Sequence, residues 1–146
     1  MRKQAWIVLV GGLAIGSGTL MLSEPSRAAE EPKVDFVKDI QPILETTCVK
    51  CHGADPQGKK PKGKFDITTK EKAFSTGENK DKNFKKTANE SLVYQTLLGP
   101  VGSGDDEIGR MPYKKDPLPA EQIKLIKDWI DQGANWPDNV KIKLKE

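Results

Sequence analysis

Both cysteines of the chain lie in one short segment, Cys48-Val49-Lys50-Cys51-His52, which ends on the only histidine. This C-x-x-C-H order is the attachment signature of haem c. Two thiols at this spacing can form thioether bonds with the two vinyl groups on one edge of the macrocycle. The next residue, His52, can then bind the iron as an axial ligand. The segment therefore predicts one covalently attached haem c, held by Cys48, Cys51 and His52.

Three other interpretations of the cysteine pair compete with haem attachment. A zinc site needs about four ligands, whereas the chain has 2 cysteines and 1 histidine in total. A thioredoxin-like redox pair needs a βαβ setting, and no segment shows one. A disulfide between Cys48 and Cys51 would close a very small loop and restrain little of the chain. We therefore favour haem attachment.

The first 28 residues have the composition of a cleaved signal peptide. Arg2 and Lys3 give a positive start, an uncharged stretch follows over residues 5–22, and a signal peptidase could cut after Ala28. The uncharged stretch approaches the length that spans a bilayer, so an uncleaved membrane anchor through residues 5–22 is the alternative. In both cases the chain is exported, to the periplasm or to the outer face of the cytoplasmic membrane.

A second axial ligand can be found by elimination among the methionines. Met1 and Met21 lie in the export segment, which leaves Met111. Met111 lies in a polar loop rich in glycine and proline, an unusual place for a residue that fills a core. Its thioether would complete His/Met coordination and raise the reduction potential. Alternatively, Met111 is a packing residue, and water or a lysine such as Lys114 takes the sixth position.

Three segments carry apolar residues at the spacing of a helix. They cover residues 34–47, about 89–98 and 119–132. Pro42 should kink the first helix or restart it. A long loop joins the second helix to the third over residues 99–117. No segment long enough for a sheet-based domain shows period-two alternation, so the chain is predicted to be mainly α with long loops.

The second and third helices have the clearer predicted boundaries. Asn89 or Ser91 can cap the second helix and Gly99 can end it. Pro119 suits the first turn of the third helix and Gly133 its end. The expected buried faces are Leu92, Val93, Leu97 and Leu98 in the second helix and Ile123, Ile126, Trp129 and Ile130 in the third.

Length and charge limit the domain count and the partners. The 146 residues suffice for one domain, which we place at residues 30–140, followed by a basic tail at 141–146. The net charge is +3 and falls close to neutral without the export segment, which excludes a nucleic-acid-binding protein. The lysines at 59–64 and 80–86 could steer an acidic redox partner, although the acidic run at 105–107 argues against a uniformly basic docking face.

Further motifs follow the haem motif in order along the chain. After Cys-Val-Lys-Cys-His-Gly come Lys-Gly-Lys-Phe-Asp-Ile, Ser-Leu-Val-Tyr, Arg-Met-Pro and a final helix ending Trp-Ile-Asp-Gln-Gly-Ala-Asn-Trp-Pro. Over residues 34–137 this order resembles the planctomycete-type cytochrome c domain, which belongs broadly with class I cytochromes c. The resemblance implies N- and C-terminal helices that cross over a haem crevice. It also implies attachment through Cys48 and Cys51, with His52 as the proximal and Met111 as the distal ligand.

These features predict a mono-haem one-electron carrier rather than an enzyme. It would take electrons from one redox protein and pass them to another. One alternative is a haem enzyme or sensor, peroxidase-like or gas-binding, with an open sixth site where Arg110 could polarise a bound peroxide. Another is a haem subunit of a larger membrane oxidoreductase, which an uncleaved anchor would favour.

Overall fold

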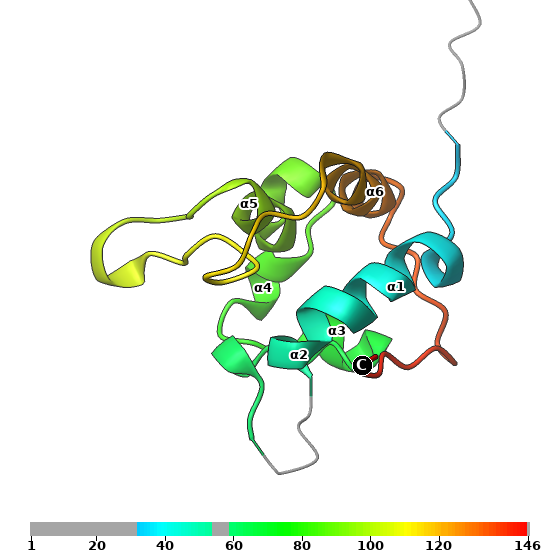
Figure 1. Cartoon of the computed structure of the whole chain (residues 1–146), viewed down its shortest axis with the longest axis horizontal. Helices are drawn as coiled ribbons and strands as arrows, with labels where there is room; N and C mark the ends of the chain where they lie inside the picture. Colours follow the sequence, from blue (N-terminus) through cyan, green and yellow to red (C-terminus); the bar gives the residue numbers. More distant parts are fainter. Residues whose placement is uncertain (1–31, 54–58, 146) are drawn as a thin grey trace, which may run out of the picture. The chain divides into compact units, whose positions relative to one another are not determined.

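The computed structural model describes residues 32–53 and 59–145 (Figure 1). The chain divides into two units, Met1–Glu30 and Glu31–Glu146, and all described residues belong to the second. The predicted export segment, residues 1–28, and its 5–22 stretch lie outside the described residues. In the part that is described, no helix is both long and apolar enough to cross a membrane.

The described part is mainly helical, which confirms the predicted class. Within these residues there are isolated β-bridges, Thr69 with Lys141 and Val101 with Ile108, but no strand. In chain order the elements are η1 (Phe36–Ile40), α1 (Gln41–Ile43), η2 (Leu44–Cys48), α2 (Val49–His52), η3 (Lys62–Lys64), α3 (Lys70–Ser75), α4 (Lys80–Asn83), η4 (Ala88–Glu90), α5 (Leu92–Leu98), η5 (Gly104–Asp106) and α6 (Ala120–Asp131).

The first four elements form one continuous helical run, because the residues at their junctions keep right-handed helical dihedrals. The Asp35 side chain caps its start and accepts a hydrogen bond from the amide of Lys38 at 2.8 Å. Pro42 lies in the first turn of α1, as expected of a proline that restarts a helix. The run continues past the predicted end at residue 47 and carries the whole C-x-x-C-H segment as far as His52.

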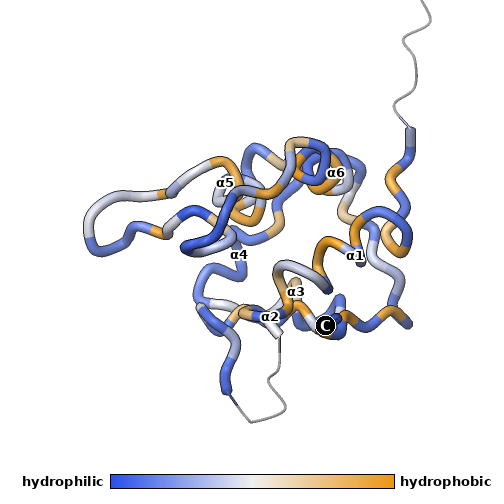
Figure 2. The backbone as a smooth tube through the Cα atoms, in the orientation of Figure 1, coloured by the Kyte–Doolittle hydropathy of each residue, from blue (hydrophilic) through white to orange (hydrophobic). Residues whose placement is uncertain are grey.

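Helix α6 packs against η1, so the first and last helices of the described chain are in contact. The ring of Phe36 lies 5.6 Å from that of Trp129 and 4.4 Å from that of Trp136. Of the predicted stripe of α6, Ile126, Trp129 and Ile130 are buried and Ile123 is partly buried. Figure 2 shows hydrophobic stretches alternating with hydrophilic ones along the run from η1 to α2 and along α6, as expected of helices with one buried face.

Helix α5 ends at Gly99 as predicted, but its buried face differs from the prediction. Leu98 is 60% exposed, whereas Tyr94 and Thr96 are buried. Adjacent helix residues such as Leu97 and Leu98 point in directions about 100° apart, and here the buried side of α5 includes Leu97 but not Leu98. Ser91 occupies the cap position, yet its hydroxyl donates to the carbonyl of Thr87 rather than capping α5.

The C-terminal tail packs onto the domain without forming a strand. Ile142 is buried, and its amide donates to the carbonyl of Thr68 at 2.9 Å. Lys145 forms an ion pair of 2.6 Å with Glu45, a buried carboxylate of η2. These contacts hold the tail against the helical run that ends at His52.

Candidate functional site

The C-x-x-C-H segment lies at the end of the first helical run. Cys48 is the last residue of η2, and Cys51 and His52 belong to α2. Residues three apart on a helix lie on the same side, so the two thiols are neighbours. Both cysteines are free; Cys48 is partly buried against the hydrophobic core and Cys51 is exposed. The helical run therefore presents both thiols at its C-terminal end.

Burial gives the two thiols different environments. Desolvation, and secondarily the neighbouring Cys51, raises the pKa of Cys48 to about 12. At neutral pH Cys48 is therefore a protonated thiol packed against apolar side chains, and the thiol that faces solvent is Cys51.

The ring of His52 has a defined orientation. Its Nδ1 lies 3.1 Å from the backbone carbonyl oxygen of Lys62. A carbonyl oxygen can only accept a hydrogen bond, so Nδ1 carries the proton, and in a neutral ring Nε2 then carries the lone pair. Metal-binding histidines commonly donate their second ring nitrogen to a carbonyl in this way. The contact leaves His52 in the tautomer that an iron ligand requires.

Burial and hydrogen bonding act on the pKa of His52 in opposite directions. Desolvation lowers this pKa, while the backbone hydrogen bonds of Lys62 and Phe65 raise it by less, so it lies below its ordinary value. The imidazole is therefore neutral at pH 7, which is the form that binds metals.

The segment after the motif wraps around His52. The amide of Ile67 donates to the His52 carbonyl at 2.8 Å, and the ring of Phe65 lies 5.4 Å from the imidazole. Gly53 ends α2 where the backbone passes too close for a side chain. A Cβ there would lie 2.5 Å from Val49 Cγ2 and 2.6 Å from the Val49 carbonyl oxygen. The glycine that follows the haem motif thus allows the chain to turn back toward His52.

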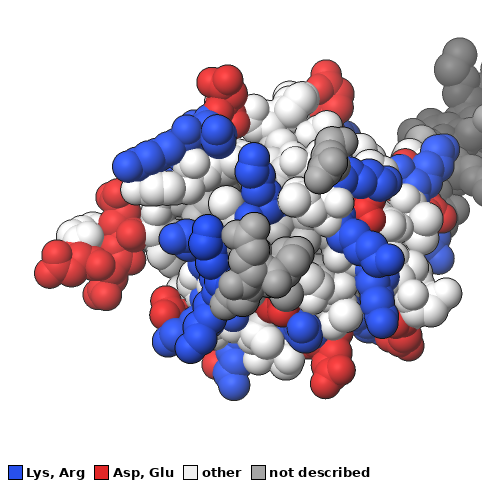
Figure 3. Space-filling view, turned by 60° about the horizontal axis from the view of Figure 1, so that its bottom comes forward, with Lys and Arg blue, Asp and Glu red and all other residues white. Residues whose placement is uncertain are grey.

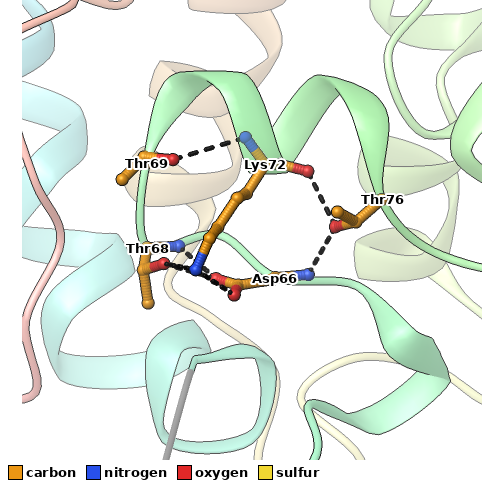
Figure 4. Close-up of polar contacts among 5 residues, drawn as sticks. All are labelled: Asp66, Thr68, Thr69, Lys72 and Thr76. Atoms are coloured by element: carbon orange, nitrogen blue, oxygen red, sulfur yellow. Dashed lines mark hydrogen bonds and ion pairs between the residues drawn. The ribbon is translucent and has the colours of Figure 1, made fainter.

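Asp66 organises a polar network next to this segment (Figure 4). Its carboxylate accepts hydrogen bonds from the amide and the hydroxyl of Thr68 and pairs with the Lys72 ammonium at 3.0 Å. Its own amide donates to the hydroxyl of Thr76 at 2.9 Å. The network joins Phe65-Asp66-Ile67 to α3 and so fixes the backbone that holds His52.

The pKa of Asp66 reflects this network. Burial alone would raise it, but the hydrogen bonds from Thr68, followed by the Lys72 ammonium, outweigh burial and hold the pKa below its ordinary range. Asp66 is therefore ionised at neutral pH, and its charge contributes to the stability of the segment.

Met111 comes from the long loop between α5 and α6. Its amide donates to the carbonyl of Thr96 in α5 at 2.8 Å, and its side chain packs partly buried against the hydrophobic core. Two hydrogen bonds between Val101 and Ile108 close the preceding part of the loop into a narrow turn. Gly109 faces the ring of Tyr113, and a Cβ there would lie 3.0 Å from that ring. The loop thus has a fixed path on both sides of Met111.

Cys48 and Met111 both contact the hydrophobic core, whereas Lys114, the alternative sixth ligand, does not belong to it. Cys48 and Met111 pack against the same hydrophobic cluster, although they lie far apart in the sequence. Lys114 is exposed and lies 5.3 Å above the ring of Tyr113. The partly buried thioether of Met111 is therefore a better candidate for an axial ligand than the exposed ammonium of Lys114.

The supporting residues of His52 were not singled out as site residues in the sequence. The carbonyl of Lys62, the ring of Phe65 and the carboxylate of Asp66 all contribute. The signal for them was the Lys-Gly-Lys-Phe-Asp-Ile run. The contact with Lys62 is made by a backbone carbonyl, which no side-chain pattern in the sequence can indicate.

The candidate residues offer thiol, imidazole and thioether groups, which are the donors that haem c uses. A porphyrin supplies the equatorial ligands itself and asks the protein for thiols and axial donors only. Cys48, Cys51, His52 and Met111 have the chemistry of that set.

Comparisons with protein-family models, curated proteins and solved structures found no match to this chain. The candidate site therefore rests on its own residues and contacts.

Proposed function

We propose that this protein is an exported mono-haem c-type cytochrome that carries one electron at a time between redox proteins. Cys48 and Cys51 would hold the haem through thioether bonds, and His52 and Met111 would bind the iron on its two faces. Haem iron, when bound, supplies the change between two oxidation states. The chain's own residues hold the group, fix its ligands and exclude water.

The observation that carries this proposal is the hydrogen bond from His52 Nδ1 to the Lys62 carbonyl. It fixes the tautomer and direction of the one histidine in the chain, directly after two thiols at the attachment spacing. A histidine with a purely structural role has no need of this combination. In a metal site the same contact holds the ligand and raises its basicity.

Met111 supports a carrier rather than an open-site enzyme. Its loop is anchored to α5 by the amide of Met111 itself, and its side chain already contacts the core. A thioether delivered from a fixed backbone needs little rearrangement when the iron changes its oxidation state. Small ligands would find the sixth position filled.

The class I arrangement is part of the proposal. In that fold the N- and C-terminal helices contact each other above the haem, and η1 and α6 are in contact here through Phe36 and Trp129. The rest of the run from η1 to α2 then leads from this contact to the attachment cysteines. The packing of the terminal helices would set where the haem lies.

The charge of the surface bears on the partners. Figure 3 shows a face on which basic side chains are spread widely, with acidic ones between them and an acidic group at the left end. That end is where η5 lies in Figure 1, and it carries Asp105 and Asp106. Such a mixed surface suits brief encounters with a redox donor and acceptor more than one permanent partner.

The visible spectrum of the oxidised and reduced protein tests His/Met ligation. We expect the weak far-red band of iron–methionine bonding in the oxidised form and no binding of carbon monoxide by the reduced form. Covalent haem without the band, together with carbon monoxide binding, would instead indicate an enzyme or sensor with an open sixth site.

A further inference from the structure

Arg110, the residue before Met111, has a buried nitrogen atom for which no described residue provides a hydrogen-bond partner. Among the described residues, three buried side-chain atoms lack a hydrogen-bond partner: Glu45 Oε2, Asn83 Nδ2 and Arg110 Nη1. Glu45 Oε2 has the Lys145 ammonium 2.6 Å away, and the amide of Asn83 is neutral. Arg110 is therefore the cation in this group without a counter-charge.

The guanidinium of Arg110 is held in place by the turn that follows Met111. Its Nη2 donates to the carbonyl of Lys115 at 2.8 Å, and the Lys115 amide donates to the carbonyl of Pro112 at 3.2 Å. One side of the guanidinium is thus pinned to the loop, which leaves Nη1 fixed and buried. An arginine side chain with no binding role at this position would be expected to extend its guanidinium into solvent.

A buried guanidinium nitrogen without a partner is unfavourable, and proteins normally pair such a group with an anion. None of the ion pairs within the described ranges includes Arg110. We therefore look for the anion outside the described residues. It should be small enough to reach a buried atom beside Met111.

We propose that Nη1 of Arg110 binds a propionate of the haem, an inference that rests on the proposed function. The propionates are the anionic groups of haem, and guanidinium nitrogens match carboxylates in both charge and geometry. Because the same loop carries Met111, one segment would supply the distal ligand and the counter-charge together.

This contact has a consequence for the redox equilibrium. A positive charge close to haem disfavours the oxidised iron, and neutralising a propionate acts in the same direction. Arg110 therefore raises the reduction potential, and it also restrains the loop that holds Met111. Its role is that of a positioning residue that acts through the haem substituent.

The test uses the full-length holoprotein and three variants. Arg110→Gln removes both the positive charge and the guanidinium group. Arg110→Lys keeps the positive charge but lacks the guanidinium group. Lys115→Gln is the control, because it removes an exposed charge from the same loop. Two quantities are measured: the oxidised-to-reduced ratio at a fixed ambient potential, and the propionate bending mode in the resonance Raman spectrum. The far-red band and covalent haem after denaturation are recorded for each protein.

We expect Arg110→Gln to shift the ratio toward the oxidised form by about tenfold, which corresponds to about 59 mV for one electron. The propionate mode should shift in Arg110→Gln, and by less in Arg110→Lys. Lys115→Gln should leave the mode unchanged and move the ratio far less.

Three results would overturn the inference while leaving the proposed function intact, provided covalent haem and the far-red band persist. The first is an unchanged ratio in Arg110→Gln. The second is an equal shift of the ratio in Lys115→Gln. The third is a changed ratio with an unchanged propionate mode in Arg110→Gln, since Arg110 would then act as a charge at a distance.

If the Arg110→Gln protein fails to accumulate, Arg110→Lys takes its place, and an unchanged propionate mode in that variant would contradict the contact. A wild-type protein without covalent haem would refute the proposed function and this inference with it.

Discussion

The two sides of the candidate site are built differently. On the His52 side, the histidine belongs to a helix and is held by the Lys62 carbonyl, the Ile67 amide and the ring of Phe65. On the Met111 side, the ligand lies in a loop held to α5 by its own amide. Next to it lies a buried guanidinium nitrogen with no partner in the described chain.

Under the proposed function, this difference means that the protein completes one half of the site itself and leaves the other half to be completed by haem. The contacts of His52 are all within the chain, so its orientation does not need a haem. The Met111 loop contains an unsatisfied cation, so it reaches its most favourable state only when an anion arrives. We therefore expect changes on the His52 side to affect attachment and stability, and changes on the Met111 side to affect the redox properties.

The largest effect is expected from replacing both cysteines with alanine. Cys48→Ala combined with Cys51→Ala should abolish covalent haem, because no other thiol exists in the chain. The measurement is the haem colour of the protein band after denaturing electrophoresis. Colour that persists in the double variant would show that haem is attached elsewhere.

The Met111 side should respond in its potential rather than in attachment. Met111→Ala should lower the reduction potential by about 0.1 to 0.2 V, a fraction of the ~0.8 V range that axial ligands span. It should also abolish the far-red band and admit carbon monoxide to the reduced iron.

Lys114→Ala is the matched control, because Lys114 lies in the same loop and is exposed. It should leave the potential, the band and carbon monoxide exclusion as they are in the wild type. If the two variants exchange these outcomes, Lys114 is the sixth ligand.

Asp66 tests the stability of the His52 side. Asp66→Asn removes the charge that faces Lys72 and should lower the free energy of unfolding by about 1 to 2 kcal/mol at pH 7. The folded-state pKa of Asp66 is depressed, so its contribution is present above the ordinary carboxyl value of ~3.9 and is lost as pH falls through the folded pKa. Denaturant titrations at several pH values should show the gap to wild type closing in acid.

Asp105→Asn provides the comparison for Asp66, since Asp105 is an exposed carboxylate in η5. Its effect should stay within about 0.5 kcal/mol at every pH. A gap for Asp66→Asn that is constant with pH would contradict the account of its pKa.

The smallest effect concerns the thiols before haem is attached. In protein made without attachment machinery, an alkylating agent should modify the exposed Cys51 about tenfold faster than Cys48, whose pKa is raised to about 12. Trypsin cuts after Lys50 and so separates the two cysteines for mass analysis. Equal alkylation rates of Cys48 and Cys51 in native buffer would mean that the burial of Cys48 is not established before haem is attached.

Much of the fold follows from the sequence. The helical class, the last helix with its buried Ile126, Trp129 and Ile130, and the end of α5 at Gly99 all came from periodicity and end signals. The prediction was wrong about Leu98, because periodicity in a helix this short does not tell which of two adjacent leucines is buried.

The site was predictable only where side chains carry the chemistry. The residue types and spacing of Cys48, Cys51 and His52 predict them as site residues, and elimination predicts Met111. The Lys62 carbonyl could not be predicted, since every residue has a carbonyl group and only the path of the backbone selects this one. The unpaired nitrogen of Arg110 could not be predicted either, because it is defined by a contact that is missing among the described residues.

The central claim is covalent haem on Cys48 and Cys51, and one measurement tests it most directly. The protein is produced with haem-attachment machinery, denatured, stripped of loose haem and weighed as intact chains and as peptides. The account predicts one haem per chain, carried by a peptide that contains both cysteines and His52. A chain that has the mass of the polypeptide alone, with both thiols free, would contradict it.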